Sequence, residues 1–554
     1  MNKGLISLIA IVCILLCLLP IVSVFLAAVT APLETISRLA DTVLFRYIVN
    51  TLMLVFWVTG GSILIGTITA WIVSTTEFPG RKILEIALVI PLAFPAYIIA
   101  YAYTDILDHP GIVQSTLRQT FNLGPRDYWF PEIRSLGGAA CMLVLVLYPY
   151  VYLLARSVFK SSVANAFNAA QSLGASRMRA FLFVALPMAR PAIAAGAFLV
   201  IMETIADFGT VSYFSVQTFA TGIYTSWIGL GERGAAAQLA LGLLAFALLI
   251  AFLEYNNRKN LDIADADNKR DVVSRIALDR TQTVFAQLIC ALPIVFGAII
   301  PASALLLMGM NAEQNIFSER YARFFMNTLV LATLAAVVTV LAAVFISTLN
   351  RFLKSRLSLL AMFIGRLGYA VPGGVIAVGL LVPFASFDNW LDSVLTDLFG
   401  ISTGLLFTGS IALLVAAYMI RFLAAAIGAY DSGLSTISIN VDRASQIMGS
   451  TTGGTIRKVH LPMLKLNVFT AALIVFVDTI KELPATLILR PFNYDTLAVQ
   501  AYRLAADERL EAAALPSLII ALIGLIPVLL LCLRLSETQK SAPLTARFQK
   551  PIQY

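Results

Sequence analysis

Twelve apolar segments, each about as long as a membrane-spanning helix, follow one another along the 554 residues of the chain. A helix needs about 20 apolar residues to cross the hydrocarbon core of a bilayer. The segments lie at roughly 5–30, 47–75, 83–104, 136–156, 190–213, 235–253, 282–309, 324–349, 357–383, 400–427, 465–488 and 512–534. The pattern predicts an all-α polytopic membrane protein with about twelve transmembrane helices in a lipid bilayer.

The composition agrees with lipid as the solvent for much of this surface. Hydrophobic residues make up 59% of the chain, charged residues only 13%, and the mean hydropathy is +0.87, whereas soluble domains are about 25% charged. The net charge of +8 does not indicate a nucleic-acid partner, because the basic residues are spread between apolar segments. The first segment is too long for the apolar core of a signal peptide, about 7–15 residues, so we expect it to be a span.

The charges between the segments predict the orientation. With both termini in the cytoplasm, most of the 39 basic residues fall on the cytoplasmic side, as the positive-inside rule requires. Segment 384–399 then becomes an external loop, and it carries Asp388, Asp392 and Asp397 but no Lys or Arg. We expect a solvated loop there rather than a metal site.

Motifs that recur at an almost constant offset indicate an internal duplication. The sequence Arg-x3-Asn-Thr-Leu occurs at 46–52 and again at 323–329, an offset of 277. Pro95 and Pro372 have the same offset. An even number of helices in each half makes the halves parallel repeats, related by an axis along the membrane normal. The duplication therefore predicts two parallel six-helix repeats.

A charged segment separates the two halves. Between 254 and 280, nearly half of the positions are charged, which is typical of a solvated cytoplasmic linker. The predicted organisation is a first half at 1–253, a linker at 254–281, a second half at 282–535 and a cytoplasmic tail at 536–554.

The connection between the fourth and fifth spans of each half carries another repeated motif. Its members are Asn168-Ala169-Ala170, Gly174 and Leu186-Pro187 in the first half, and Arg443-Ala444-Ser445, Gly449 and Leu461-Pro462 in the second. A glycine can end a short helix with a positive φ, and a proline suits the first turn of the next helix. The motif resembles the EAA loop of ABC-transporter permeases.

The resemblance implies a fold like that of type I ABC importer permeases, with each loop presenting a coupling helix to an ATPase subunit. Two loops in one chain imply two ATPase subunits. Asn168 and Arg443 depart from the family at the first motif position, so no carboxylate contact with the ATPase is available there. The sequence has no Gly-x4-Gly-Lys-Ser/Thr phosphate-binding loop, so we expect no enzyme activity or cofactor on this chain, and ATP hydrolysis on a separate subunit.

Three further stretches, at 203–224, 481–498 and 505–516, are similar to the fused permeases of bacterial ferric-iron uptake. The resemblance covers nearly the whole chain. It implies an inner-membrane permease that receives ferric ion from a periplasmic ferric-binding protein. Double-length permeases of this group also serve thiamine and phosphonates, which are alternative substrates.

Ionisable residues inside predicted spans are costly and by default mark a function. Glu203 and Asp207 are separated by one helical turn, and Asp478 and Glu482 repeat this spacing at an offset of 275, next to Lys481. A spacing of four places each pair on one helix face, so both halves could present two carboxylates to a shared pathway and attract a cation. In the structural alternative, Asp478 pairs with Lys481, or the acids lie at the wet outer end of the helix.

The remaining ionisable residues suggest partners rather than further sites. Arg366 and Arg421 are intramembrane cations suited to pairing with such acids. His109 and His460 are expected in loops and have no metal-ligand spacing, so no metal site is assigned. An ion-coupled secondary transporter would also use intramembrane acids, but it would have no ATPase for paired EAA-like loops to contact.

Overall fold

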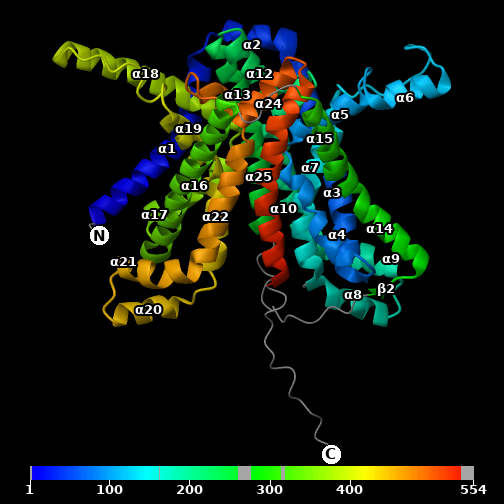
Figure 1. Ribbon diagram of the computed structural model, residues 1–554. Coiled ribbons are helices and arrows are strands. Elements are labelled where there is room, and N and C mark those ends of the chain that lie inside the picture. The colour runs from blue at the N-terminus through cyan, green and yellow to red at the C-terminus, as the bar shows by residue number, and fades with distance from the viewer. Residues whose placement is uncertain (1–2, 161, 260–275, 313–317, 538–554) are drawn as a thin grey trace, which may run out of the picture.

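The computed structural model describes residues 3–160, 162–259, 276–312 and 318–537. Within these ranges, eleven helices are long and apolar enough to cross a membrane, and a bent pair makes a twelfth span (Figure 1). The predicted all-α fold with about twelve transmembrane helices is confirmed.

The elements follow the duplication. The first half contains α1 (Lys3–Thr30), α2 (Leu33–Leu39), α3 (Phe45–Thr75), β1 (Thr76–Glu77), α4 (Arg81–Ala87), α5 (Ala96–Leu107), α6 (Ile112–Phe121), α7 (Leu136–Lys160), α8 (Ser162–Ser172), α9 (Arg177–Ala180), α10 (Leu186–Ala206), α11 (Gly209–Tyr213), α12 (Phe219–Tyr224) and α13 (Arg233–Lys259). The rest contains β2 (Ile276–Ala277), α14 (Arg280–Ile294), α15 (Ile300–Asn311), α16 (Glu319–Leu353), α17 (Arg356–Leu367), α18 (Gly373–Phe399), α19 (Ile411–Leu434), α20 (Ile439–Ile447), α21 (Thr452–Thr455), α22 (Leu461–Lys481), α23 (Pro484–Leu489), α24 (Leu497–Ala506) and α25 (Leu510–Glu537). Short 3-10 helices are η2 (Ile90–Ala93) and η6 (Gly368–Ala370), and π turns are η1 (Ala40–Leu44), η3 (Phe181–Ala185), η4 (Thr225–Gly229), η5 (Val295–Ile299) and η7 (Ile456–His460).

The third span of each half is broken at the duplicated proline. Pro95 precedes α5 and Pro372 precedes α18, each with extended backbone after a short 3-10 helix. A proline cannot donate a backbone hydrogen bond and disfavours helix in the residue before it. In the first half the bend reaches 93°. The spans predicted at 83–104 and 357–383 are therefore each two helices rather than one.

Helix α18 corrects the prediction of an external loop at 384–399. The helix continues to Phe399, and Asp388 is only 1% exposed. Its carboxylate accepts a hydrogen bond from the backbone N–H of Thr408 at 2.8 Å, and that of Asp392 accepts one from Gly404 at 2.8 Å. These acids fasten the segment that follows the helix, a role that net charge alone does not reveal.

The duplicated Asn-Thr motif holds a later loop of its own half in place. Asn50 Nδ2 donates to the carbonyl of Gln217 at 2.8 Å, and Asn327 Nδ2 donates to that of Asp495 at 3.0 Å. The neighbouring threonine hydroxyls each accept a backbone N–H from the same loop, at 3.4 and 2.9 Å. The sequence repeat is therefore also a repeat of tertiary contacts.

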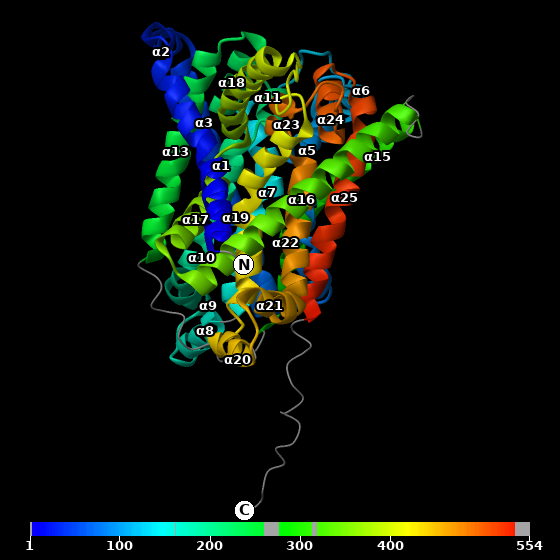
Figure 2. The same cartoon turned by 90° about the vertical axis from the view of Figure 1, so that its left-hand side faces the viewer.

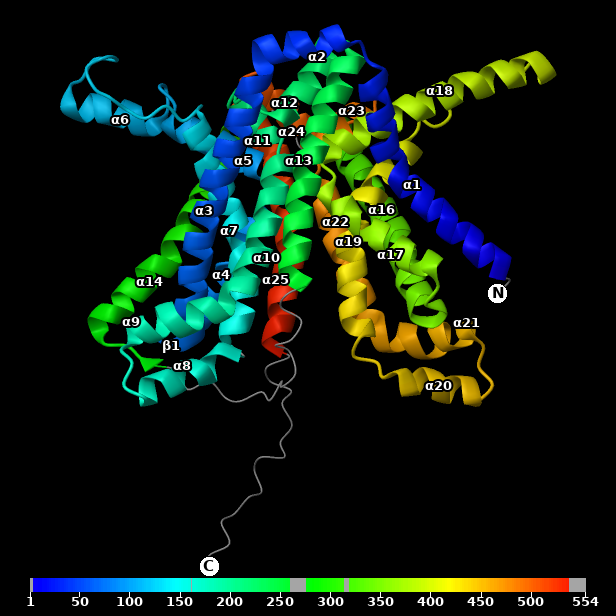
Figure 3. The ribbon, with the colours of Figure 1, turned by 180° about the vertical axis from the view of Figure 1, so that it is seen from behind.

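The two segments that carry the EAA-like motif lie at the same end of the molecule. Helices α8 and α9 lie at the bottom on one side, and α20 and α21 at the bottom on the other (Figures 1 and 3). The side view shows them at that end as well, with α2 and α24 at the opposite end (Figure 2). Two parallel halves require this arrangement, since equivalent loops then emerge on one side of the membrane.

The last part of the linker between the halves lies at the same end of the molecule as these loops. β2 pairs in parallel with β1, with Thr76 opposite Ile276 and Glu77 opposite Ala277. The middle of the predicted linker, 260–275, and the predicted tail beyond residue 537 lie outside the described residues.

Candidate functional site

Each EAA-like segment consists of a short helix, a turn at a glycine, and a second short helix that is capped by a side chain. Residues 162–187 are named here the first coupling loop and residues 439–462 the second coupling loop. Gly174 follows α8 with φ +90° and Gly449 follows α20 with φ +82°. In both, the residue after the glycine donates to the carbonyl five positions earlier, at 3.0 and 3.1 Å, as in a Schellman motif. The positive φ expected at both glycines is confirmed.

The Leu-Pro pairs lie inside a continuous span rather than at its start. Pro187 and Pro462 occupy the first turn of α10 and α22. Each follows a π turn, and the continuous spans begin earlier, at Arg177 and Thr452. Because a proline leaves a backbone carbonyl without its usual partner, a wider turn before it is a common accommodation. The span starts predicted at 190 and 465 are therefore too late.

The other motif residues differ in exposure between the two loops. Ala169 and Ala444 are exposed, as is Arg443, whose side chain is free to reach a partner. Ser445 is buried, and its hydroxyl lies 2.9 Å from that of Thr455. Ala170 is half-buried and Asn168 lies within α8.

Aromatic packing fastens the first coupling loop to the membrane part of the protein. Phe167 of α8 is 3% exposed, and its ring centroid lies 4.9 Å from that of Trp71. The Trp71 ring also contacts Phe159 at 5.2 Å and Phe181 at 4.7 Å. This attachment is built from aromatic rings.

A buried charge network fastens the second coupling loop. Asp442 is the equivalent of Phe167 at the offset of 275, and it accepts a hydrogen bond from Arg351 Nε at 2.6 Å. His460 Nε2 lies 2.6 Å from its other oxygen. Although burial opposes it, the hydrogen bonds from His460 and Arg351 lower the pKa of Asp442. His460 is fully buried, so its predicted place in a loop is wrong.

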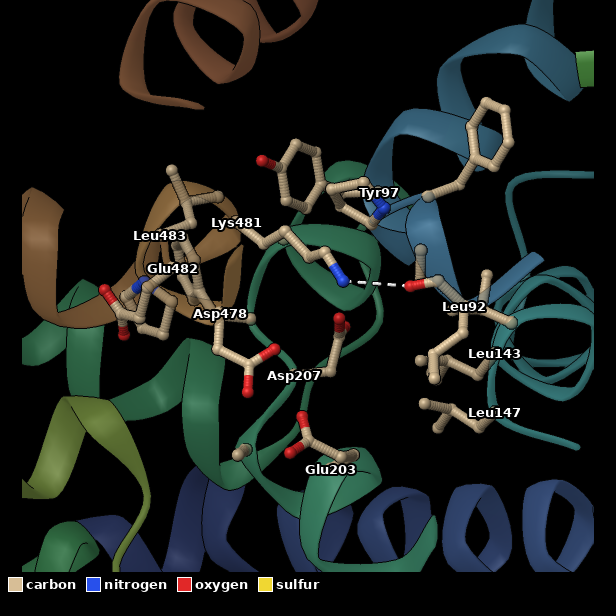
Figure 4. A pocket seen from close by; sticks show the side chains of 18 of the residues that line it. Leu92, Tyr97, Leu143, Leu147, Glu203, Asp207, Asp478, Lys481, Glu482 and Leu483 are labelled. Atoms are coloured by element: carbon tan, nitrogen blue, oxygen red, sulfur yellow. Dashed lines mark hydrogen bonds between the residues drawn. The ribbon is translucent and has the colours of Figure 1, made fainter. Parts of the chain in front are cut away.

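A cavity of about 130 Å³ lies between the two halves (Figure 4). Its walls come from α10 and α7 of the first half, from α22 of the second, and from the residues around the break at Pro95. All five residues predicted to line a pathway line it: Glu203, Asp207, Asp478, Lys481 and Glu482. The structure thus brings together side chains from equivalent positions of the two halves.

Two of the four carboxylates are helix caps. Asp207 follows the last residue of α10. Its Oδ1 accepts hydrogen bonds from the backbone N–H groups of Thr210 and Val211, both at 3.1 Å, and its Oδ2 accepts one from the Thr210 hydroxyl at 3.0 Å. The carboxylate of Glu482 likewise accepts hydrogen bonds from the backbone N–H groups of Ala485 and Thr486, at 3.0 and 3.1 Å. Because both acids lie beyond the helix end, the prediction that each i,i+4 pair shares one helix face is wrong.

The other two carboxylates, Glu203 and Asp478, are far less engaged. Glu203 Oε1 accepts a hydrogen bond from the Tyr369 hydroxyl at 2.9 Å. Within the described ranges, Asp478 has no hydrogen bond and no ion pair. Lys481 Nζ donates instead to the carbonyl of Leu92 at 2.9 Å (Figure 4). The alternative that Asp478 pairs directly with Lys481 is therefore wrong.

The two halves touch through equivalent elements at this cavity. Tyr369 belongs to η6 of the second half and reaches α10 of the first, whereas Leu92 belongs to η2 of the first half and is reached from α22 of the second. Each broken third span thus contacts the fifth span of the other half. Polar contacts that cross between the halves therefore lie at the cavity and beside it.

Of the two intramembrane arginines predicted to pair with these acids, only Arg421 does so. Arg421 lies 3.7 Å from Glu482 Oε1. Arg366 instead pairs with Asp431 at 2.9 Å, away from the cavity lining. In the part of the chain that the structure describes, no group of three or more His, Cys, Asp or Glu is arranged to hold a metal ion.

An ion pair that sequence reasoning missed joins the halves at the end opposite the coupling loops. Arg134, in the loop before α7, donates to both oxygens of Glu508 at 2.5 and 2.8 Å, and to Asp108 at 3.2 Å. The hydrogen bond from Arg134 lowers the pKa of Glu508. Glu508 lies in one of the stretches that resemble iron-uptake permeases, but nothing in the sequence pairs it with Arg134.

Comparison with known families decides what kind of protein carries this site. The family model described as "binding-protein-dependent transport system inner membrane component" matches the chain twice, at residues 62–259 and 340–535. The chain belongs to this family. Each matched range contains one coupling loop and half of the cavity acids. The prediction of a fused, double-length ABC importer permease is confirmed.

Relatives of this permease include proteins of similar length. It is 25% identical to the Fe(3+)-transport system permease protein FbpB 2 of Haemophilus influenzae over 87% of this chain and 88% of that one. It is 23% identical to the ferric transport system permease protein FbpB of Actinobacillus pleuropneumoniae over 85% of this chain and 68% of that one. A Salmonella typhimurium protein, named provisionally as a 2-aminoethylphosphonate transport permease, is 28% identical over 38% of this chain and 74% of its own.

Replacing Asp442 is expected to loosen the second coupling loop of this permease. The change Asp442→Asn leaves the half-buried Arg351 and the fully buried His460 without their shared anion. Breaking a fully buried pair costs about 3–5 kcal/mol, which is the upper bound of the loss here. We expect new protease cleavage within 435–450 and a lower melting temperature. Because the folded pKa of Asp442 is lowered, the parental pairing contributes stability above the ordinary Asp pKa of about 4 and is lost as the pH falls through the folded value.

The neighbouring exposed residue provides the control. Arg443→Ala removes a charge one position away without touching the network, so its cleavage pattern and melting temperature should match those of the parent. An Asp442→Asn protein with parental melting and cleavage would show that the network does not hold the loop.

Proposed function

We propose that this chain is the permease subunit of an ATP-driven, binding-protein-dependent importer that moves ferric iron inward across the bacterial inner membrane. The observation that carries the proposal is the cavity between the halves, which collects four carboxylates in a chain that is similar over most of its length to relatives named for ferric transport. Carboxylate oxygens are hard ligands and attract a multivalent cation. A periplasmic ferric-binding protein delivers the ion, and this chain itself binds no cofactor.

The cavity forms part of the translocation pathway in this proposal. It lies between two parallel halves, as substrate sites do in transporters built from repeats. Glu203, Asp207, Asp478, Lys481 and Glu482 line it from both sides.

Two ATPase subunits supply the energy through the coupling loops. Beside the two glycines, Leu173 and Met448 occupy equivalent positions and are 90% and 79% exposed. Large apolar side chains this exposed are typical of surfaces that bind another protein. Docking through shape and apolar contact suits loops that lack the acidic first residue of the family motif.

The orientation and domain division follow from this arrangement. The ATPase subunits act in the cytoplasm, so the coupling loops and both termini lie on the cytoplasmic side. The first half extends over 1–253, the linker over 254–281, the second half over 282–535 and the tail over 536–554. The basic residues between spans support this direction.

We expect one copy of this chain to bind two copies of an ATPase subunit, because it carries two coupling loops at one end. Native mass determination of the purified complex measures this ratio. A stable assembly with a single ATPase per permease, or full transport without any ATPase, would contradict the proposal and favour an ion-coupled carrier.

Uptake into proteoliposomes tests the substrate. The permease, its ATPase and its binding protein should take up radioactive iron supplied as the ferric-loaded binding protein, and only with ATP on the side of the ATPase subunits. Thiamine and 2-aminoethylphosphonate serve as competing substrates. Uptake of either of these instead of iron would overturn the ferric assignment while leaving the importer class in place.

A further inference from the structure

The four carboxylates of the cavity are not equivalent, and the difference repeats in both halves. Both oxygens of Asp207 and both oxygens of Glu482 accept hydrogen bonds from the next helix, from its backbone N–H groups and from the hydroxyl of Thr210 or Thr486. Glu203 and Asp478, also equivalent at the offset of 275, have one hydrogen bond and none among the described residues. In Figure 4 the carboxylates of Glu203, Asp207 and Asp478 face the same space, whereas that of Glu482 is turned away from it.

A second group in the cavity also lacks a partner. Tyr97 lines the cavity and is 4% exposed, yet within the described part of the chain its hydroxyl has no hydrogen-bond partner. The hydroxyl interacts electrostatically with both Glu482 and Asp207, one from each half, so it lies at the junction of the two halves. An unpaired buried hydroxyl costs free energy unless something binds to it. The cavity therefore contains oxygen ligands that no described protein group uses.

Lys481 places a positive charge beside these ligands without neutralising either acid directly. It interacts electrostatically with Asp478 and Glu203, but its ammonium donates to the carbonyl of Leu92. The equivalent residue of the first half, Ala206, has no charge. The lysine is therefore a fixed cation in one half of a site that the duplication would otherwise make symmetric.

We propose that Glu203 and Asp478 bind the cargo cation transiently, and that Lys481 acts as a resident counter-ion that keeps this binding weak. The inference rests on the proposed function. Conduction requires a site that is favourable enough to enter and weak enough to leave. Among the described residues, no third acidic, His or Cys residue joins Glu203 and Asp478 in a group that could hold a metal ion. The ammonium group of Lys481 also opposes the binding of a cation there. A site made of these two carboxylates therefore meets that requirement.

Equilibrium binding of iron to the full-length permease in lipid nanodiscs tests this assignment. Radioactive ferric ion is supplied as its citrate chelate, and the parent is compared with Lys481→Met. Removing one positive charge close to the site should tighten ferric binding by about tenfold or more, because charge interactions in such a medium are this strong over several ångströms. Uptake by the complete transporter should become slower, because the ion dissociates more slowly from the tighter site.

Two further variants control for misfolding and for non-specific charge effects. Lys481→Met combined with Asp478→Asn removes both charges and should lose the tightened binding. Lys465→Met changes an exposed lysine of the same helix α22 and should bind iron as the parent does. Parental affinity in Lys481→Met, or tightening that survives Asp478→Asn, would overturn the inference. A transporter that imports no iron at all would instead overturn the proposed function, so the two failures are distinguishable.

Discussion

Valine at the two loop glycines is expected to abolish coupling between ATP hydrolysis and transport. Gly174 and Gly449 have φ values of +90° and +82°. A β-branched residue in this conformation costs about 1–2 kcal/mol, which lowers the population of the folded turn by about 5- to 30-fold. Gly174→Val and Gly449→Val should therefore still insert into the membrane, but each should lose most ATP hydrolysis stimulated by the loaded binding protein.

The cause of this loss is conformational rather than steric, and the structure shows why. A Cβ atom added at either glycine meets nothing within 4 Å. Gly453 of the second coupling loop also has open space around its Cβ, but its φ is not in the left-handed region. Gly453→Val should consequently retain coupled hydrolysis. Gly449→Asn should lie between the two, because asparagine tolerates positive φ better than valine.

The measurement is ATP hydrolysis by the reconstituted transporter with and without loaded binding protein. Undiminished stimulation in both valine variants would show that these turns do not transmit force. A loss of coupling in Gly453→Val as large as that in Gly449→Val would show that side-chain bulk, rather than backbone conformation, is responsible.

The sequence predicted those features that depend on local chemistry or on the repeat. Apolar length defined the spans, and the Gly and Pro residues of the motif marked the loop turns because few other residues fit a left-handed turn or lack a backbone donor. The offset of 275 also identified the charged residues that line the cavity from both halves. Such features are decided within one turn of helix or by comparison with the other half.

The features that the sequence did not predict depend on tertiary contacts. Asp442 lies one position before the EAA-like motif of the second half, and its partners Arg351 and His460 come from other helical segments. A histidine beside a membrane boundary has no pattern that distinguishes an exposed ring from a buried one. The roles of Asp207 and Glu482 were mistaken because a spacing of four indicates one helix face only where the helix continues, and α10 and α22 end first.

The two equivalent pairs of cavity acids are expected to respond differently to neutralisation. The variant Glu203→Gln with Asp478→Asn should assemble with its ATPase normally, because these carboxylates have at most one hydrogen bond each among the described residues. Its iron uptake should fall by about tenfold or more, since the cation loses two charges that favour its entry. Uptake by proteoliposomes and the yield of intact complex measure the two quantities separately.

The caps provide the matched comparison. The variant Asp207→Ala with Glu482→Ala removes acceptors from backbone N–H groups at the start of α11 and α23. Loss of a helix cap costs about 0.5–2 kcal/mol each, so the complex should melt at a lower temperature and assemble in smaller amounts. Arg421, which lies 3.7 Å from Glu482, would also lose its acid. Normal assembly of this variant with strongly reduced uptake would show that the caps contact the cargo too. Parental iron uptake by the variant Glu203→Gln with Asp478→Asn would show that these two acids are not part of the pathway.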